Sequence, residues 1–208
     1  IEGRDFIGDN VNIEAVDARS GQVYASLDHG HFGTKLHRSD DGGESWSEIA
    51  VPTYPDPPEG WVEIPNPFTG KVAPWSLEMI WSIEPGSPDE PGRVWCGTIP
   101  GGLFRSDDSG DSWSLVRPLW DLEARKHWMG AGMDYAGIHS ILIDPRDADH
   151  VTVGVSVGGI YHTTDGGESW AAIGEGLRAE YVPPEQAGNP EVQDPHCLVH
   201  CLGEPDTM

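Results

Sequence analysis

Two histidines occupy matching positions in stretches of similar sequence. His139 lies in the run "IHSILID" and His196 lies in the run "PHCLVHC". Four stretches of the chain align on Asp17, Glu84, Asp144 and Cys201. Five positions before these residues stand Asn12, Met79, His139 and His196. Imidazoles that point together into one channel could bind a metal ion or an anionic group. The alternative, which we favour, is a strand histidine bonded to a neighbouring carbonyl or to water.

Aromatic residues and carboxylates gather in three long segments, 47–73, 114–137 and 171–193. The aromatic residues in or just after them are Tyr54, Trp61, Phe68, Trp75, Trp120, Trp128, Tyr135 and Tyr181. The carboxylates beside them are Glu78, Asp134 and Asp194. Aromatic faces next to carboxylates would suit stacking on a sugar or another flat ligand. Equally, the aromatic residues could cap the core beneath the loops, and both interpretations stay open.

The elements that must position these residues follow from an internal repeat. "SDDGGESW" at 39–46 returns as "SDDSGDSW" at 106–113 and as "TTDGGESW" at 163–170. We call these three segments the repeated turn. Each copy follows three short β-rich runs and precedes a fourth. Four antiparallel strands in a repeat of about 60 residues are typical of one blade of a β-propeller.

The side chains of the repeated turn have a structural explanation. A Ser or Thr hydroxyl and an Asp carboxylate bond backbone N–H groups in a tight turn. The glycines supply positive φ, and the Trp packs between blades. We therefore predict structural roles for Ser39, Asp41, Gly43, Trp46, Ser106, Asp108, Gly110, Trp113, Thr163, Asp165, Gly167 and Trp170.

The pattern Ser/Thr-x-Asp-x-Gly-x-x-Trp resembles the Asp-box, or bacterial neuraminidase repeat (BNR), and the resemblance covers residues 10–208. The family includes sialidases, xyloglucanase-type glycosidases and sorting receptors. The stretches "HSILIDPRDADHV" and "QDPHC" are most similar to sialidase-like and photosystem II stability factor-like propellers of unknown function. The resemblance implies that the repeated turn joins the third and fourth strands of a blade. It also implies that ligands bind at the opposite face, near the propeller axis.

The sequence favours a binding role over catalysis. A sialidase needs three arginines around its substrate, but Arg38 and Arg105 directly precede repeated turns and Arg146 lies in a "DPRD" turn. We therefore expect a ligand-binding or scaffold propeller with an aromatic loop face. The alternative is a glycoside hydrolase, sialidase-like or xyloglucanase-like, that acts on glycans through a carboxylate pair. Whether the chain is an enzyme stays open at this point.

Charge narrows the range of partners. The chain carries 35 acidic and 12 basic residues, for a net charge of -23. Such a surface repels phosphate backbones and anionic membranes, so we expect no nucleic-acid or membrane partner. A glycan or another small ligand is compatible with it. We expect no cofactor and assign no metal site.

The repeats also set the domain organisation. We predict an all-β, partial propeller over residues 1–208, with repeats at 10–73, 74–136 and 137–193 and a truncated fourth repeat at 194–208. Propellers close with about four to eight blades, whereas these repeats make about three and a half. The ring would therefore need a second copy of the chain or a further segment to complete it.

Overall fold

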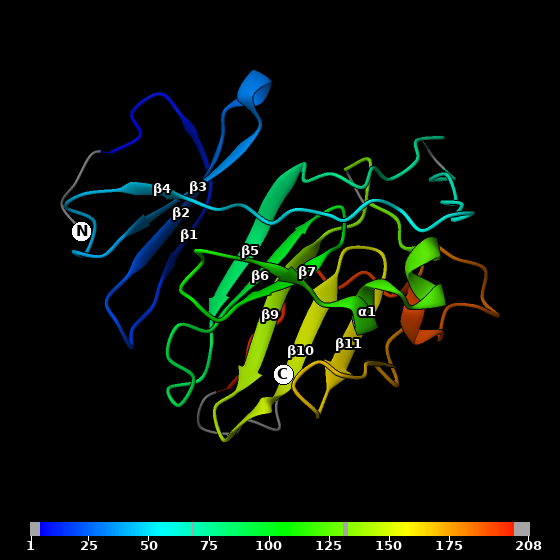
Figure 1. The fold of residues 1–208 in the computed structure, drawn as a ribbon. Helices are drawn as coiled ribbons and strands as arrows, with labels where there is room; N and C mark the ends of the chain where they lie inside the picture. Colours follow the sequence, from blue (N-terminus) through cyan, green and yellow to red (C-terminus); the bar gives the residue numbers. More distant parts are fainter. Residues whose placement is uncertain (1–4, 68, 131–132, 202–208) are drawn as a thin grey trace.

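The computed structural model describes residues 5–67, 69–130 and 133–201, which form three four-stranded antiparallel sheets (Figure 1). The first sheet holds β1 (Asn10–Val16), β2 (Val23–Asp28), β3 (Thr34–Ser39) and β4 (Ser47–Ile49). The second holds β5 (Met79–Pro85), β6 (Val94–Ile99), β7 (Leu103–Ser106) and β8 (Ser114–Leu115). The third holds β9 (Ile138–Asp144), β10 (Asp147–Val155), β11 (Gly159–Thr163) and β12 (Ala171–Ile173).

The strands of each sheet follow one another in chain order, and β1 lies against β5 as β5 lies against β9. The sheets are therefore successive blades with β1, β5 and β9 as their inner strands. We call them blades 1, 2 and 3. The helical elements are short: α1 (Arg117–Trp120), η1 (Gly30–Phe32), η2 (Glu123–His127) and η3 (Pro190–Val192). The predicted all-β, partial propeller is confirmed.

The apolar core lies between neighbouring blades. One cluster of buried side chains joins Tyr24 and Leu36 of blade 1 to Ile80 and Phe104 of blade 2. A second cluster joins blades 2 and 3 and includes the fully buried indole of Trp95. Because each blade buries its faces against its neighbours, the blades hold the inner strands in fixed relative positions.

Side-chain hydrogen bonds close each repeated turn. Ser39 Oγ accepts the Gly43 N–H at 2.7 Å and donates to Asp41 Oδ1 at 2.7 Å. Asp41 then accepts the Ser45 N–H at 2.9 Å and the Ser45 hydroxyl at 2.6 Å. Bonds to the Ser45 hydroxyl and to Ser39 favour the ionised carboxylate and lower the pKa of Asp41 to about 2. The turns at 106–113 and 163–170 repeat these bonds.

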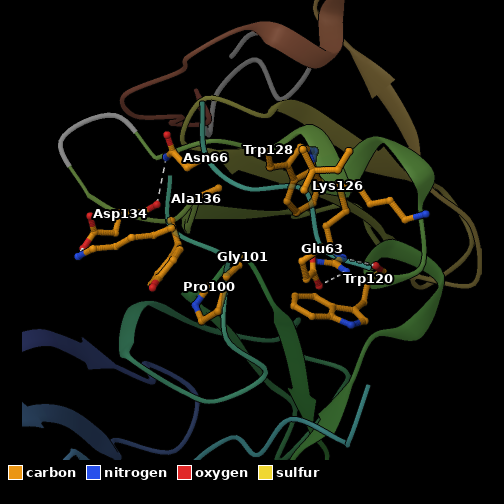
Figure 2. A pocket seen from close by; sticks show the side chains of 14 residues that line it. Glu63, Asn66, Pro100, Gly101, Trp120, Lys126, Trp128, Asp134 and Ala136 are labelled. Carbon is orange, nitrogen blue, oxygen red and sulfur yellow. Dashed lines mark hydrogen bonds and ion pairs between the residues drawn. The ribbon is translucent and has the colours of Figure 1, made fainter. Parts of the chain in front are cut away.

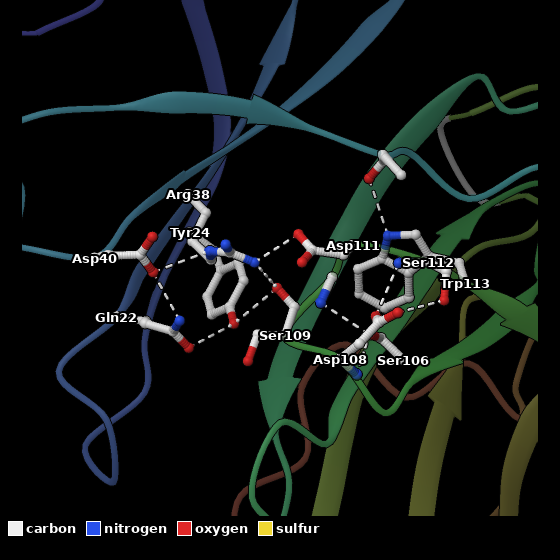
Figure 3. Close-up of polar contacts among 12 residues, drawn as sticks. Gln22, Tyr24, Arg38, Asp40, Ser106, Asp108, Ser109, Asp111, Ser112 and Trp113 are labelled. Carbon is white, nitrogen blue, oxygen red and sulfur yellow. Dashed lines mark hydrogen bonds and ion pairs between the residues drawn. The ribbon is translucent and has the colours of Figure 1, made fainter.

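The repeated turns also connect one blade to the next (Figure 3). Arg38 in blade 1 donates to the Ser109 carbonyl and to Asp111, both at 2.8 Å, in the turn of blade 2. Arg105 reaches the equivalent carbonyl, that of Gly166 in blade 3, at 3.4 Å. The turns thus set the spacing of the blades on the face opposite the inter-blade loops.

The segment assigned to a fourth repeat contributes no strand within its described part, residues 194–201. Instead, the Leu198 N–H donates to Ser140 Oγ of β9 at 3.1 Å, which places this segment beside the inner strand of blade 3. Residues 202–208, the remainder of that predicted repeat, lie outside the described residues. In the part of the chain that the structure describes, no helix is long and apolar enough to cross a bilayer.

We expect Ser106→Ala to lower the free energy of unfolding by about 1–3 kcal/mol, because it leaves the buried Gly110 N–H without its 2.8 Å acceptor. Ser112→Ala is the matched control. It removes an exposed hydroxyl from the same turn and should cost about 0.5 kcal/mol or less. Urea denaturation of both variants checks this. Equal losses would contradict the assigned role of Ser106.

Candidate functional site

Each inner strand contains one extra residue at the same place. In β1, Val11 and Ile13 pair with consecutive residues of β2, so Asn12 has no partner in the ladder. The same interruption occurs at Trp81 in β5 and at His139 in β9. Such β-bulges bend a strand and redirect a side chain, and they are over-represented next to functional sites.

The pairing with the central strands shows that these three positions are equivalent. The residues that follow the bulges, Ile13, Ser82 and Ser140, pair with Ser26, Gly97 and Gly154. In each central strand a valine pairs with the first residue of the repeated turn, and these valines are Val23, Val94 and Val151. Ser26, Gly97 and Gly154 each lie three residues after that valine.

The structure therefore corrects one member of the column predicted from the sequence. Trp81, and not Met79, is the blade 2 equivalent of Asn12 and His139. The physical reason is that Asp17 directly follows β1, whereas Glu84 lies within β5, so five positions before Glu84 falls two residues before the bulge. The counterpart of Asp17 is Gly86, whose N–H donates to the Arg93 carbonyl as the Asp17 N–H donates to that of Gln22. Glu84 is consequently not equivalent to Asp17.

The bulged residues line one cavity of about 500 Å³ near the start of the inner strands. We call it the axial cavity, and its lining is Asn12, Ile13, Trp81, His139, Ser140, Ser156, Asp194, Pro195, His196 and Cys197. Ligand pockets typically measure about 300–1,000 Å³. The structure thus brings the two predicted histidines together, and it adds Trp81.

His139 is a half-buried, polar member of this wall. Its Nδ1 lies 2.8 Å from Ser140 Oγ, and its ring meets the indole of Trp81 edge to face at 5.8 Å. Among the described residues, neither His139 Nε2 nor Asn12 Nδ2 has a hydrogen-bond partner within 3.5 Å, although both atoms are buried and the Pro195 carbonyl lies near the His139 ring. Buried polar atoms of this kind normally bond water or a ligand. Burial lowers the pKa of His139, so the ring is neutral at pH 7.

His196 is exposed and bonds its neighbour Asp194, with Nε2 at 3.3 Å from Oδ2. The other oxygen of Asp194 accepts the Val157 N–H at 3.0 Å. Among the described residues no three His, Cys, Asp or Glu side chains are placed to hold one metal ion.

The aromatic residues of the inter-blade loops surround a buried ion pair instead. Glu63 Oε1 accepts from Arg125 at 3.0 Å and from the indole N–H groups of Trp61 and Trp75 at 2.8 Å each. The Arg125 guanidinium also lies 3.9 Å from the ring centroid of Trp120. Sequence analysis missed Glu63 and Arg125, and it listed Trp75 as a candidate ligand contact.

The remaining candidates border this cluster (Figure 2). Trp128, Asp134 and Tyr135 line a cavity of only about 30 Å³. Trp128 donates to Tyr161 Oη at 3.0 Å, and Asp134 pairs with Lys71 at 2.5 Å. A cavity of this size holds about one water molecule and no sugar ring. Glu78 is exposed and lines neither this cavity nor the axial cavity.

Trp128 also borders a larger space where all three inter-blade loops meet. This loop cavity measures about 560 Å³ and is lined mainly by apolar side chains, among them Ile64, Met129 and Val192. The aromatic loop face thus contains a cavity, but one with few aromatic residues.

Two curated proteins are similar to part of the chain. It is 37% identical over 93 residues to the oligoxyloglucan-reducing end-specific xyloglucanase of Emericella nidulans. It is 30% identical over 115 residues to a probable enzyme of the same name from Neosartorya fischeri. These matches cover 44% and 55% of this chain, and the chain spans only about a tenth of each relative's length (10% and 11%). No family model matches the chain.

Solved structures share the fold. The GH74 xyloglucanase of Xanthomonas campestris matches 78% of this chain with 23% of its own at a TM-score of 0.54 and 20% identity. The Niastella koreensis GH74 enzyme matches 79% of this chain with 22% of its own at a TM-score of 0.51 and 21% identity. YCF48 from Cyanidioschyzon merolae matches 77% of this chain with 39% of its own at a TM-score of 0.48 and 17% identity.

We expect the imidazole of His139 to titrate with a midpoint below 6.5, because burial opposes its charged form. Trp81→Ala should hydrate the ring and move the midpoint back toward 6.5. A ¹H–¹³C NMR titration of the histidine rings, assigned with His139→Gln, measures both midpoints. A midpoint above 6.5 in the unaltered protein would contradict the burial argument.

Proposed function

We propose that the chain supplies three blades of a glycan-binding propeller and that the axial cavity holds one sugar unit of a neutral oligosaccharide. The observation that carries this proposal is the bulge repeated at one register position in three blades. It directs the amide of Asn12, the indole of Trp81 and the imidazole of His139 toward the same cavity.

The chemistry of the lining suits a neutral sugar. Sugar hydroxyls bond donors and acceptors, including uncharged amide and imidazole groups, and the carbohydrate ring packs on an apolar surface beside them. Asn12 and the neutral ring of His139 offer the first, and Trp81 contributes to the second. The two similar enzymes are xyloglucanases specific for the reducing ends of oligoxyloglucans, which suggests an oligoxyloglucan as the substrate class.

The arrangement of carboxylates favours binding over hydrolysis. Glycosidases need two carboxyl groups that face the scissile bond. The described lining of the axial cavity includes one, Asp194, and both of its oxygens accept hydrogen bonds. The 30 Å³ cavity has two, Glu63 and Asp134, and each is in an ion pair.

A second candidate function is glycoside hydrolysis, favoured by the 37% identity to a xyloglucanase. It would require a second carboxylate beside the axial cavity from a further segment or a second copy. We also place the chain among the Asp-box propellers, and the hydrogen bonds of the repeated turn support this assignment.

We expect Trp81→Ala to weaken binding of a xyloglucan oligosaccharide by about tenfold or more, because the apolar surface beside the sugar is lost. Trp128→Ala, in the loop cavity, should change the affinity by about twofold or less. Isothermal titration calorimetry measures both, and thermal unfolding shows that each variant is folded. The reverse order of effects would place the ligand at the loop face.

We expect the chain to release no reducing ends from xyloglucan. An assay of reducing sugar over hours checks this, with an active xyloglucanase as the positive control. If the purified chain releases reducing ends from xyloglucan and the Asp194→Asn variant does not, the binding proposal is overturned in favour of hydrolysis. The same loss in Asp134→Asn would instead identify the loop carboxylate.

A further inference from the structure

The turn between β10 and β11 contains a strained residue. Val157 has φ of 47°, in the left-handed region, and its side chain is buried. For a β-branched residue this conformation is an outlier that persists only where the surroundings impose it. Such strain is concentrated at ligand sites and switches.

Two hydrogen bonds from distant segments hold Val157. Asp194 Oδ1 accepts its N–H at 3.0 Å, and its carbonyl accepts the Met129 N–H at 2.9 Å. A side chain and a loop therefore fix both backbone polar groups of one residue. The next residue, Gly158, packs so closely that an added Cβ would lie 2.9 Å from the indole of Trp128.

The same carboxylate reaches the wall of the axial cavity. Ser156, directly before the strained residue, lines that cavity, and so does His196, which bonds the second oxygen of Asp194. Asp194 follows Val157 by 37 residues in the chain. Its two hydrogen bonds therefore join distant segments of the cavity wall.

We propose that Asp194 is a positioning residue of the axial cavity: it holds the Val157 turn in its strained form and thereby fixes Ser156 and His196 as one wall. This inference rests on the proposed function. The competing interpretation of the same geometry is a carboxylate that bonds the ligand directly.

Substitution of the strained residue separates the two interpretations. Asp194→Ala should weaken xyloglucan oligosaccharide binding by about tenfold, because the turn relaxes. Glycine adopts positive φ without strain, so Val157→Gly alone should bind within about twofold of the unaltered chain. In the double variant, Val157→Gly should restore affinity to within about threefold. A double variant as weak as Asp194→Ala would overturn the proposal, since a direct ligand contact cannot be restored in this way.

Asp194→Asn is the conservative variant, because its amide oxygen still accepts the Val157 N–H. It should keep most of the affinity that Asp194→Ala loses. Asp134→Ala is the matched control: it removes a partly buried carboxylate that pairs with Lys71 and should leave the affinity unchanged.

A ligand-free measurement keeps this inference separate from the proposed function. Amide hydrogen exchange of Met129, which reports the turn, should accelerate about tenfold in Asp194→Ala and return toward the original rate in the double variant. Unchanged exchange in Asp194→Ala would overturn the positioning role whether or not a glycan binds. If the unaltered chain binds no oligosaccharide while the exchange follows this pattern, the proposed function fails and the role of Asp194 in building the cavity wall stands.

Discussion

One inserted residue in each inner strand is the constraint on which the axial cavity depends. Side chains alternate along a strand, so an extra residue changes the direction in which the following side chains point. Asn12, Trp81 and His139 occupy this position in β1, β5 and β9, and all three line one cavity. A register shift in a single blade would remove its contribution to that cavity.

The repeated turns help to hold the three blades, and with them the three bulged residues, in fixed relative positions. Each turn closes its own blade through a Ser or Thr and an Asp. In blades 1 and 2 the residue before the turn, Arg38 or Arg105, also reaches the turn of the next blade. On the loop side, the Glu63–Arg125 pair ties the loop after β4 to the loop after β8. Contacts between blades are thus present both at the repeated turns and among the inter-blade loops. Both sets restrict the blades to one relative arrangement.

Sequence reasoning was accurate where the signal was local and repeated. The repeated turns predicted four-stranded blades because turn chemistry depends on adjacent residues. The same periodicity predicted a column of His139 and His196; both line the axial cavity, but His196 lies in a described segment that forms no strand. The blade 2 member was wrong because the acidic residue matched to Asp17, Glu84, lies within β5 and not directly after it. The bulge lies 14, 16 and 15 residues before Ser26, Gly97 and Gly154, so no fixed spacing in the sequence identifies Trp81. The loop aromatics could not be resolved in this way, because the pairing of Glu63 with Arg125 spans 62 residues without a sequence pattern.

The central claim is that a neutral glycan occupies the axial cavity, and NMR of the free and titrated protein tests it most directly. The measurement follows the histidine ring and tryptophan indole signals while a xyloglucan oligosaccharide is added. The account predicts saturable shifts for His139 and Trp81, with the indole of Trp128 unchanged. Saturable shifts confined to Trp128 and its loop neighbours, with His139 unaffected, would contradict it.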